Sequence, residues 1–298
     1  MNILGVRKIW FGVSWLVIII GILAMSFYGY RTGIDFAGGT ILEIQIETSG
    51  NDLDHKQLIV DSYKEVVGLD VAVVTVDHNR YMVRSKQIIN EQKNEILAYL
   101  LQYFDKVDEL RFESVDPSIG YDVVRKAIIA ILLAVVGILL YIAYSFRRMS
   151  GSLNSWRFSM AAIVALVHDM LILLGLYAIV GKFFGAEIDG MFIVAVLTLL
   201  GFSVHDTIVT FDRVRENLRR RAGEDIEIII NDSIVETVVR SINTSFTLLL
   251  VLMAMFFFGG NTLKFFVLAL IIGVIVGTYS SIFIAAPMLL WGRQSKRS

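Results

Sequence analysis

Residues 127–146 read AIIAILLAVVGILLYIAYSF, twenty consecutive positions without a charged side chain. A helix needs about 20 apolar residues to cross the hydrocarbon core of a bilayer, so this stretch predicts a membrane span. Five further stretches have a similar length and an apolar composition, and they occupy residues 9–30, 158–181, 188–211, 241–263 and 265–292. The sequence therefore predicts an α-helical polytopic membrane protein with six transmembrane helices.

The composition favours a membrane protein and offers no enzyme motif. The chain has 298 residues, of which 56% are hydrophobic and 18% charged, whereas soluble domains average about 25% charged. Cysteine is absent, which excludes disulfides, thiolate metal sites and a cysteine nucleophile. No nucleotide-binding loop, metalloprotease motif or serine-hydrolase motif occurs. We expect no enzymatic activity, no cofactor and no metal, so that any work would draw on an ion gradient or on a partner.

Basic residues at the ends of the spans predict the orientation. Six spans place both termini on one side, and that side carries thirteen Lys and Arg residues near span ends against five on the other. Because Lys and Arg next to the spans stay on the cytoplasmic side, both termini are expected in the cytoplasm and the chain in the cell (inner) membrane. The first span is expected to remain uncleaved. The arginines at 219–221 fit this charge bias and predict no nucleic-acid site.

One long polar segment, residues 31–122, separates the first two spans and is expected outside the cytoplasm. It holds nine Lys and Arg against seventeen Asp and Glu. Its periodicities predict strands at 40–47, 71–76, 81–84 and 107–115, helices at 54–67 and 87–104, and a tight turn at 78–80. This βαββαβ order predicts a ferredoxin-like domain. The predicted domains are therefore 1–30, 31–122 and 123–298.

Two charged residues inside the spans are the leading functional candidates, Asp206 and Arg240. Charges at membrane depth are costly and by default mark a function. Asp206 lies on a helix face with Ser203, Thr207 and Thr210, and Arg240 lies in a second stripe with Thr237, Ser241, Thr244 and Thr247. We expect the fourth and fifth spans to pack stripe to stripe with Asp206 near Arg240. The pair is either a proton relay, in which a movable arginine controls the carboxylate, or a static salt bridge.

Three further ionisable residues lie in the spans, His205, His168 and Asp169. The neighbours His168 and Asp169 predict either a second relay group or a hydrogen bond that packs helices. A metal site built from His168 and His205 is not expected, because no third ligand stands at a recognisable spacing.

Several ordered motifs resemble the SecD/SecF family of protein-export membrane subunits, and in particular its SecF-type members. After the first span comes GIDFAGGT, which contains Gly33, Asp35, Phe36, Gly38, Gly39 and Thr40. The other motifs are ALVHD at 165–169, GFSVHDTIV at 201–209, FDRVREN at 211–217, residues 231–245 and GTYSSI at 277–282. The chain departs from the family pattern at His205, where Asn is usual, and at Asp116, where Gly is usual.

The resemblance implies a fold, partners and a mechanism. Such a chain is similar to one six-span half of a resistance-nodulation-division transporter, and SecD supplies the other half together with a further acid. The pair is expected to associate with the Sec translocon and, within membrane lipid, to use the proton motive force to pull the exported polypeptide outward. The proton-linked acid of the family falls on Asp206 and its functional arginine on Arg240.

Two other functions fit the same architecture. One is a half-transporter for lipids or small molecules, which only the motifs disfavour. The other is a non-motor scaffold of the translocon, in which Asp206 and Arg240 form a static bridge. Ion flux through the complex would separate the scaffold from the other two functions.

Overall fold

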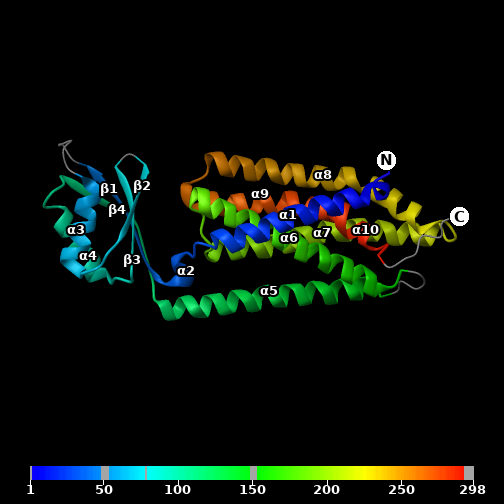
Figure 1. Cartoon of the computed structure of the whole chain (residues 1–298), viewed down its shortest axis with the longest axis horizontal. Helices are drawn as coiled ribbons and strands as arrows, with labels where there is room; N and C mark the ends of the chain where they lie inside the picture. Colours follow the sequence, from blue (N-terminus) through cyan, green and yellow to red (C-terminus); the bar gives the residue numbers. More distant parts are fainter. Residues whose placement is uncertain (1, 48–53, 78, 148–152, 292–298) are drawn as a thin grey trace. The chain divides into compact units, whose positions relative to one another are not determined.

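The computed structural model describes residues 2–47, 54–77, 79–147 and 153–291. The chain divides into two compact units, one made of Met1–Arg31 with Ile128–Ser298 and the other of Thr32–Ala127 (Figure 1). Some residues used in the predictions above lie outside the described residues, namely Arg148, Arg293, Lys296 and Arg297 for the orientation and His78 in the expected turn.

Six helices in the described chain are long and apolar enough to cross a membrane, as predicted. They are α1 (Arg7–Tyr28), α5 (Pro117–Ser145), α6 (Ser155–Phe184), α7 (Gly190–Arg220), α8 (Ile226–Phe258) and α9 (Lys264–Ser280). A short π-helical segment, Ser281–Ala285, continues α9 into α10 (Ala286–Met288). Short 3-10 helices at Leu4–Val6 and Asn261–Leu263 precede α1 and α9.

Polar residues stand where three of the spanning helices begin. The side chains of Asn154, Asp189 and Asp225 accept hydrogen bonds from backbone N–H groups in the first turns of α6, α7 and α8. Each side chain satisfies a donor that has no partner within the helix. From Asp189 the helix continues to Arg220, nine residues beyond the end of the predicted span.

Small residues set the closest helix contacts in this unit. A Cβ added at Gly175 of α6 would lie 2.4 Å from the Cα of Gly21 in α1, so these helices touch through their backbones. A Cβ added at Gly273 of α9 would lie 3.1 Å from Cδ1 of Leu199, and one added at Gly277 would lie 3.1 Å from Cβ of Ser203, both side-chain atoms of α7. These two glycines therefore let α9 approach α7 closely.

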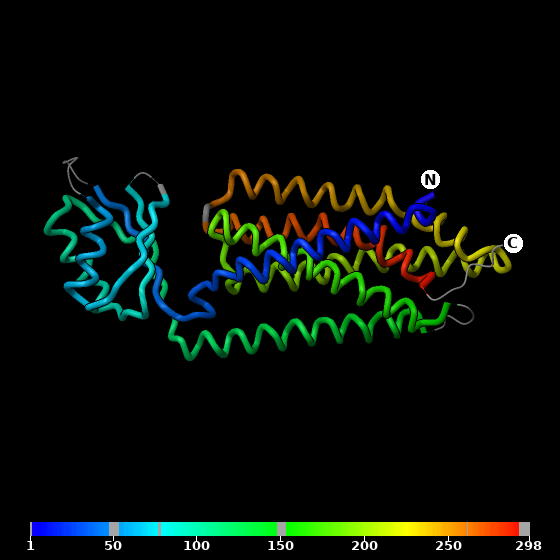
Figure 2. Tube along the Cα trace, in the orientation of Figure 1, coloured from blue at the N-terminus to red at the C-terminus, as the bar shows by residue number. Residues whose placement is uncertain are grey.

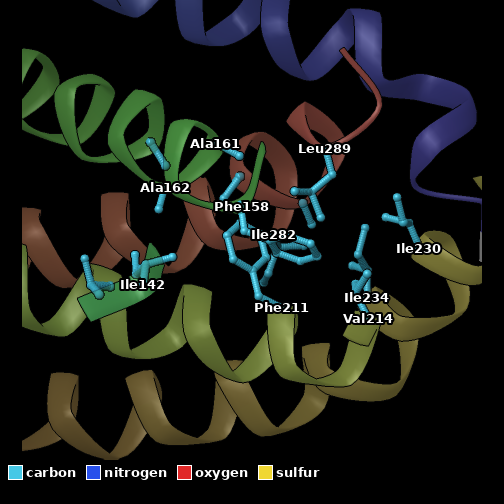
Figure 3. Close-up of a cluster of buried hydrophobic side chains, with 14 of the residues drawn as sticks. Ile142, Phe158, Ala161, Ala162, Phe211, Val214, Ile230, Ile234, Ile282 and Leu289 are labelled. Carbon is cyan, nitrogen blue, oxygen red and sulfur yellow. The ribbon is translucent and has the colours of Figure 1, made fainter. Parts of the chain in front are cut away.

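The largest apolar core of the unit joins α5, α6, α7, α8 and residues 282–289, which follow α9, near the chain termini. Phe158 of α6 stacks on Phe146 at 4.8 Å between ring centroids, and Phe211 of α7 meets Phe158 edge-on at 5.1 Å. Ile282, Leu289 and Ile234 line the same core (Figure 3). This core fixes one end of the helices that carry the charged residues described below.

In the second unit a four-stranded antiparallel sheet packs with two helices, and every strand and helix predicted for this part of the chain is present. The elements are β1 (Gly39–Glu47), α3 (His55–Val67), β2 (Ala72–Asp77), β3 (Arg80–Ser85), α4 (Asn90–Leu100) and β4 (Lys106–Val115). The strands lie in the order β2-β3-β1-β4. Both helices cover one face of the sheet, where Leu42, Ile44 and Ile46 of β1 form the core (Figure 2).

The second helix of this unit is shorter than predicted. The periodicity predicts a helix over 87–104 from Ile88/Ile89, Ile96/Leu97, Leu100/Leu101 and Phe104, but α4 runs from Asn90 to Leu100. The backbone N–H of Ile88 donates instead to Thr40 Oγ1 at 3.0 Å, which holds this residue against β1. Ile88 and Phe104 are buried outside the helix, so the prediction of its ends was wrong. Ile96 and Leu100 are buried as the periodicity predicts, whereas Ile89 and Leu101 are exposed.

Candidate functional site

Two carboxyl groups lie inside the helical bundle. Asp169 of α6 is fully buried, and Asp206 of α7 is 6% exposed. A charge at this depth costs several kcal/mol unless other groups compensate it. The two acids are compensated in different ways, and this difference guides the assignment of their roles.

Asp169 has hydrogen-bond partners from three helices. His168 Nδ1 lies 2.9 Å from Oδ1 of Asp169. The hydroxyl of Ser203 on α7 donates to Oδ2 at 2.5 Å, and the hydroxyl of Ser280 on α9 donates to the same oxygen at 2.7 Å. Asp169 therefore ties α6 to both α7 and α9.

His168 extends this network to α1. Its Nε2 lies 3.0 Å from Ser14 Oγ, which in turn lies 3.1 Å from the hydroxyl of Tyr279. The Tyr279 hydroxyl donates to the backbone oxygen of Trp10 at 2.9 Å, and its ring stacks on the imidazole of His168. One continuous chain of hydrogen bonds thus crosses α1, α6, α7 and α9.

Asp206 has fewer hydrogen-bond partners than Asp169. Ser241 of α8 donates to its Oδ1 at 2.6 Å. Among the residues that the structure describes, no group donates to Oδ2, although this oxygen is buried. An ionised carboxylate with a buried, undonated oxygen is costly, whereas a protonated one carries no charge there. Asp206 is therefore the acid better suited to take up a proton in this conformation.

Arg240 does not pair with Asp206. Within the described residues the two side chains form no ion pair, and Arg240 is exposed. It lines a cavity of about 340 Å³ together with Val209, Asp212, Arg213, Glu216, Glu236 and Thr237. In this cavity Arg213 is already paired with Glu216 and Glu236.

The helix period explains why Arg240 is exposed, although the sequence predicts it on the contact face of its helix. The buried face of α8 repeats every four residues through Ser233, Thr237, Ser241 and Ser245. The helices do meet there, through Ser241 and Asp206 and through the hydroxyls of Thr210 and Thr237, 3.4 Å apart. The expected packing of the two polar stripes is thus correct, but Arg240, Thr244 and Thr247 are exposed beside the contact.

The remaining histidine candidates lie apart. His205 is exposed although its neighbour Asp206 is buried, because successive residues point about 100° apart around a helix. His168 is buried in the contact with α1. In the described part of the chain, no three His, Asp or Glu side chains are grouped so that they could hold a metal ion.

Sequence reasoning missed three members of the buried network, Ser14, Tyr279 and Ser280. The signal for Ser280 was the break of the apolar pattern by Ser280 and Ser281 near the end of the last span. A π-helical segment, Ser281–Ala285, begins directly after Ser280. The hydroxyl of Ser280 reaches Asp169, and that of Ser281 lies 2.9 Å from Thr207 Oγ1. Short π-helical segments within helices are frequent at functional sites.

The GIDFAGGT segment forms a compact corner where β1 begins. Gly33 precedes the short helix α2 (Ile34–Ala37), and its oxygen accepts the N–H groups of Phe36 and Ala37. Gly38 has φ 72° and Gly39 has φ 119°, a region that favours glycine. Thr40 Oγ1 lies 3.0 Å from Ser114 Oγ, which joins β1 to β4. Asp35 stands in the first turn of α2.

We predict that Gly38→Ala destabilises this unit by about 1–3 kcal/mol, because the new Cβ would lie 2.7 Å from Cα of Pro117 in a backbone conformation that alanine rarely adopts. The matched control is Gly68→Ala, which has φ 68° and no atom within 4 Å of the added Cβ. Thermal unfolding of the intact protein, followed by hydrogen exchange of β1, checks the difference. Equal losses in both variants would mean that backbone strain, and not the contact with Pro117, requires glycine.

These features define the class of the molecule: a six-span membrane protein with buried acids in its third and fourth spans and a small α+β unit inserted between the first and second. The chain belongs to the SecD/SecF family, since the family described as "Protein export membrane protein SecD/SecF, C-terminal" matches residues 96–295. The resemblance inferred from the motifs is therefore confirmed.

Individual relatives match almost the whole chain. It is 42% identical to the protein translocase subunit SecF of Thermobaculum terrenum, over 97% of this chain and 93% of the relative. It is 33% identical to the protein translocase subunit SecDF of Bacillus subtilis, over 98% of this chain but only 38% of that protein. The crystal structure of SecDF from Thermus thermophilus, a translocon-associated membrane protein, superposes with a TM-score of 0.80 at 29% identity, over 97% of this chain and 38% of that one.

Proposed function

We propose that this chain is a SecF subunit of the Sec protein translocation machinery, which acts with SecD to promote protein export and draws on the proton motive force. The observation that carries the proposal is the similarity over nearly the full length to chains that bear the name SecF. We infer that the chain is no enzyme and that its work depends on a gradient across the membrane.

SecD is the proposed partner half. The Bacillus subtilis relative is a single SecDF chain, and the present sequence accounts for 38% of it. We propose that SecD supplies the counterpart of the remainder of that fused chain. We propose that the two halves together bind the Sec translocon and the exported polypeptide, within membrane lipid.

We propose that Asp206 takes up and releases the transported proton and that Arg240 controls it. The undonated Oδ2 of Asp206 supports the first role. Arg240 supports the second because it stands one residue before Ser241, the partner of Asp206, and is not held by an ion pair among the described residues. An arginine that approaches a carboxylate favours its ionised form, and one that withdraws favours the neutral acid. His205 lies beside Asp206 in sequence and is the nearest further candidate.

We propose that residues 31–122 form a ferredoxin-like domain outside the cytoplasm, between the first span at 1–30 and the bundle of 123–298, with both termini cytoplasmic. The element order and the antiparallel strand order β2-β3-β1-β4 support the domain type. The excess of basic residues near the other span ends supports the orientation.

The proposal is tested in proteoliposomes that contain the translocon with this chain and SecD. We expect an imposed proton gradient to increase export of a preprotein only when both subunits are present. A sodium gradient of equal size is the control for the coupling ion. Stimulation that persists after the gradients have been dissipated would favour the non-motor scaffold, and gradient-driven movement of lipid without preprotein would favour a half-transporter.

A further inference from the structure

The pair of His168 and Asp169 is a buried titratable group that the proposed relay does not use. Its hydrogen bonds are complete on every polar atom of both side chains. The directions of these bonds can be worked out from the number of protons that each group owns.

The count begins at Tyr279. Its hydroxyl owns one proton, which it donates to the backbone oxygen of Trp10. The bond between Tyr279 and Ser14 must therefore use the proton of Ser14. Since Ser14 then has no proton left for His168, Nε2 of His168 is protonated and donates to Ser14 Oγ.

One more proton lies between His168 Nδ1 and Asp169 Oδ1, which are 2.9 Å apart. If it resides on Nδ1, the pair is an imidazolium and a carboxylate; if it resides on Oδ1, both partners are neutral. The net charge of the pair is zero in either case. An additional proton would have to enter at Oδ2, where Ser203 and Ser280 already donate, and loss of the shared proton would leave a buried, unpaired negative charge.

We propose that Asp169, with its shared proton, is a positioning residue that holds α7 against α1, α6 and α9. It thereby fixes the place of Asp206 on α7, and it does not itself carry the transported proton. The inference deepens the proposed function and rests on it for the role of Asp206. Ser203 stands three residues before Asp206, about 4.5 Å along the helix axis. The first span ends at the inserted unit, so the network of Ser14, His168 and Asp169 also joins that span to the helix of the proton-carrying acid.

The geometry makes asparagine a faithful replacement at position 169. Its amide oxygen accepts from Ser203 and Ser280, and its NH₂ group donates to Nδ1 of a neutral His168, so that every bond survives without a titratable proton. Leucine keeps the volume and removes all three bonds. We expect Asp169→Asn to retain proton flux within about threefold with an unchanged pH midpoint, and Asp169→Leu to lose at least about tenfold.

A milder variant covers the case in which Asp169→Leu does not fold. Ser203→Ala removes one donor to Asp169, and we expect it to shift the pH midpoint of proton flux while the complex still assembles. The matched control is Ser245→Ala, which removes a buried hydroxyl that is bonded to Thr278 and lies outside this network. A Ser203→Ala variant with the native pH profile would overturn the positioning role.

An infrared titration separates this inference from the proposed function, because it needs neither SecD nor flux. In the purified chain, we expect the band of a buried carboxylic acid that responds to pH to persist in Asp169→Asn. Its loss in Asp169→Asn would show that Asp169 itself titrates and would overturn the inference. Its persistence in Asp206→Asn would instead count against the proposed function, because Asp206 would then not be the titrating acid.

Discussion

Asp206→Asn is expected to abolish proton-driven export while the complex assembles normally. Asparagine keeps the shape of the side chain and can still accept the hydrogen bond from Ser241, but it cannot take up or release a proton. We expect proton flux to fall at least about tenfold, to the level of vesicles without the complex, at every pH.

The measurement is gradient-driven export and proton flux in the same proteoliposomes, with assembly followed by co-purification of SecD. Ser241→Ala is the matched partner variant: it removes the hydrogen bond and leaves the acid, so it should shift the pH profile without abolishing flux. Normal gradient-driven export by Asp206→Asn at native abundance would exclude the relay role of this residue.

Arg240→Lys is expected to impair proton flux and export severely and to leave thermal stability almost unchanged. Lysine keeps the charge but loses the planar group that can bind a carboxylate through two hydrogen bonds, which a switch that must re-pair requires. Because Arg240 holds no ion pair among the described residues, the substitution should change the free energy of unfolding by less than about 1 kcal/mol.

A static bridge predicts the opposite result. Breaking a buried ion pair costs about 3–5 kcal/mol, so Arg240→Ala would then destabilise or deplete the complex. The control is Arg221→Lys, since Arg221 is also an arginine but is paired with Glu224 and Asp232. Flux and melting temperature measured together distinguish the two cases.

The spans and the elements of the insert could be predicted from local pattern. A charge-free run of some twenty residues has no stable alternative in a bilayer, because a helix satisfies its own backbone groups. Period-two alternation likewise assigned β1, where Leu42, Ile44 and Ile46 face the core. The ends of α4 could not be predicted in this way, because contacts with Thr40 outside the helix hold Ile88 in place.

The site was predicted only in part. Burial of Asp206 and Asp169 followed from their position within apolar runs, and the family motifs pointed to Asp206 and Arg240. The pairing of these two residues did not follow, since spacings of three and four residues describe overlapping faces of a helix. The contact with α7 selected the four-residue repeat that buries Ser241 and leaves Arg240 exposed.

The sequence by itself determined that this chain crosses a membrane six times, carries an inserted α+β unit and places few charges at membrane depth. The spans and their lack of charge follow from the local cost of exposing polar groups to lipid, and the elements of the insert follow from local periodicity. Only the tertiary structure decided which of the two acids has hydrogen bonds to both carboxyl oxygens. The partners of His168 and Asp169 come from helices far away in the chain: Ser14 and Tyr279, for example, are 265 residues apart. Hydrogen bonds of this kind depend on how the helices pack, which no local period encodes.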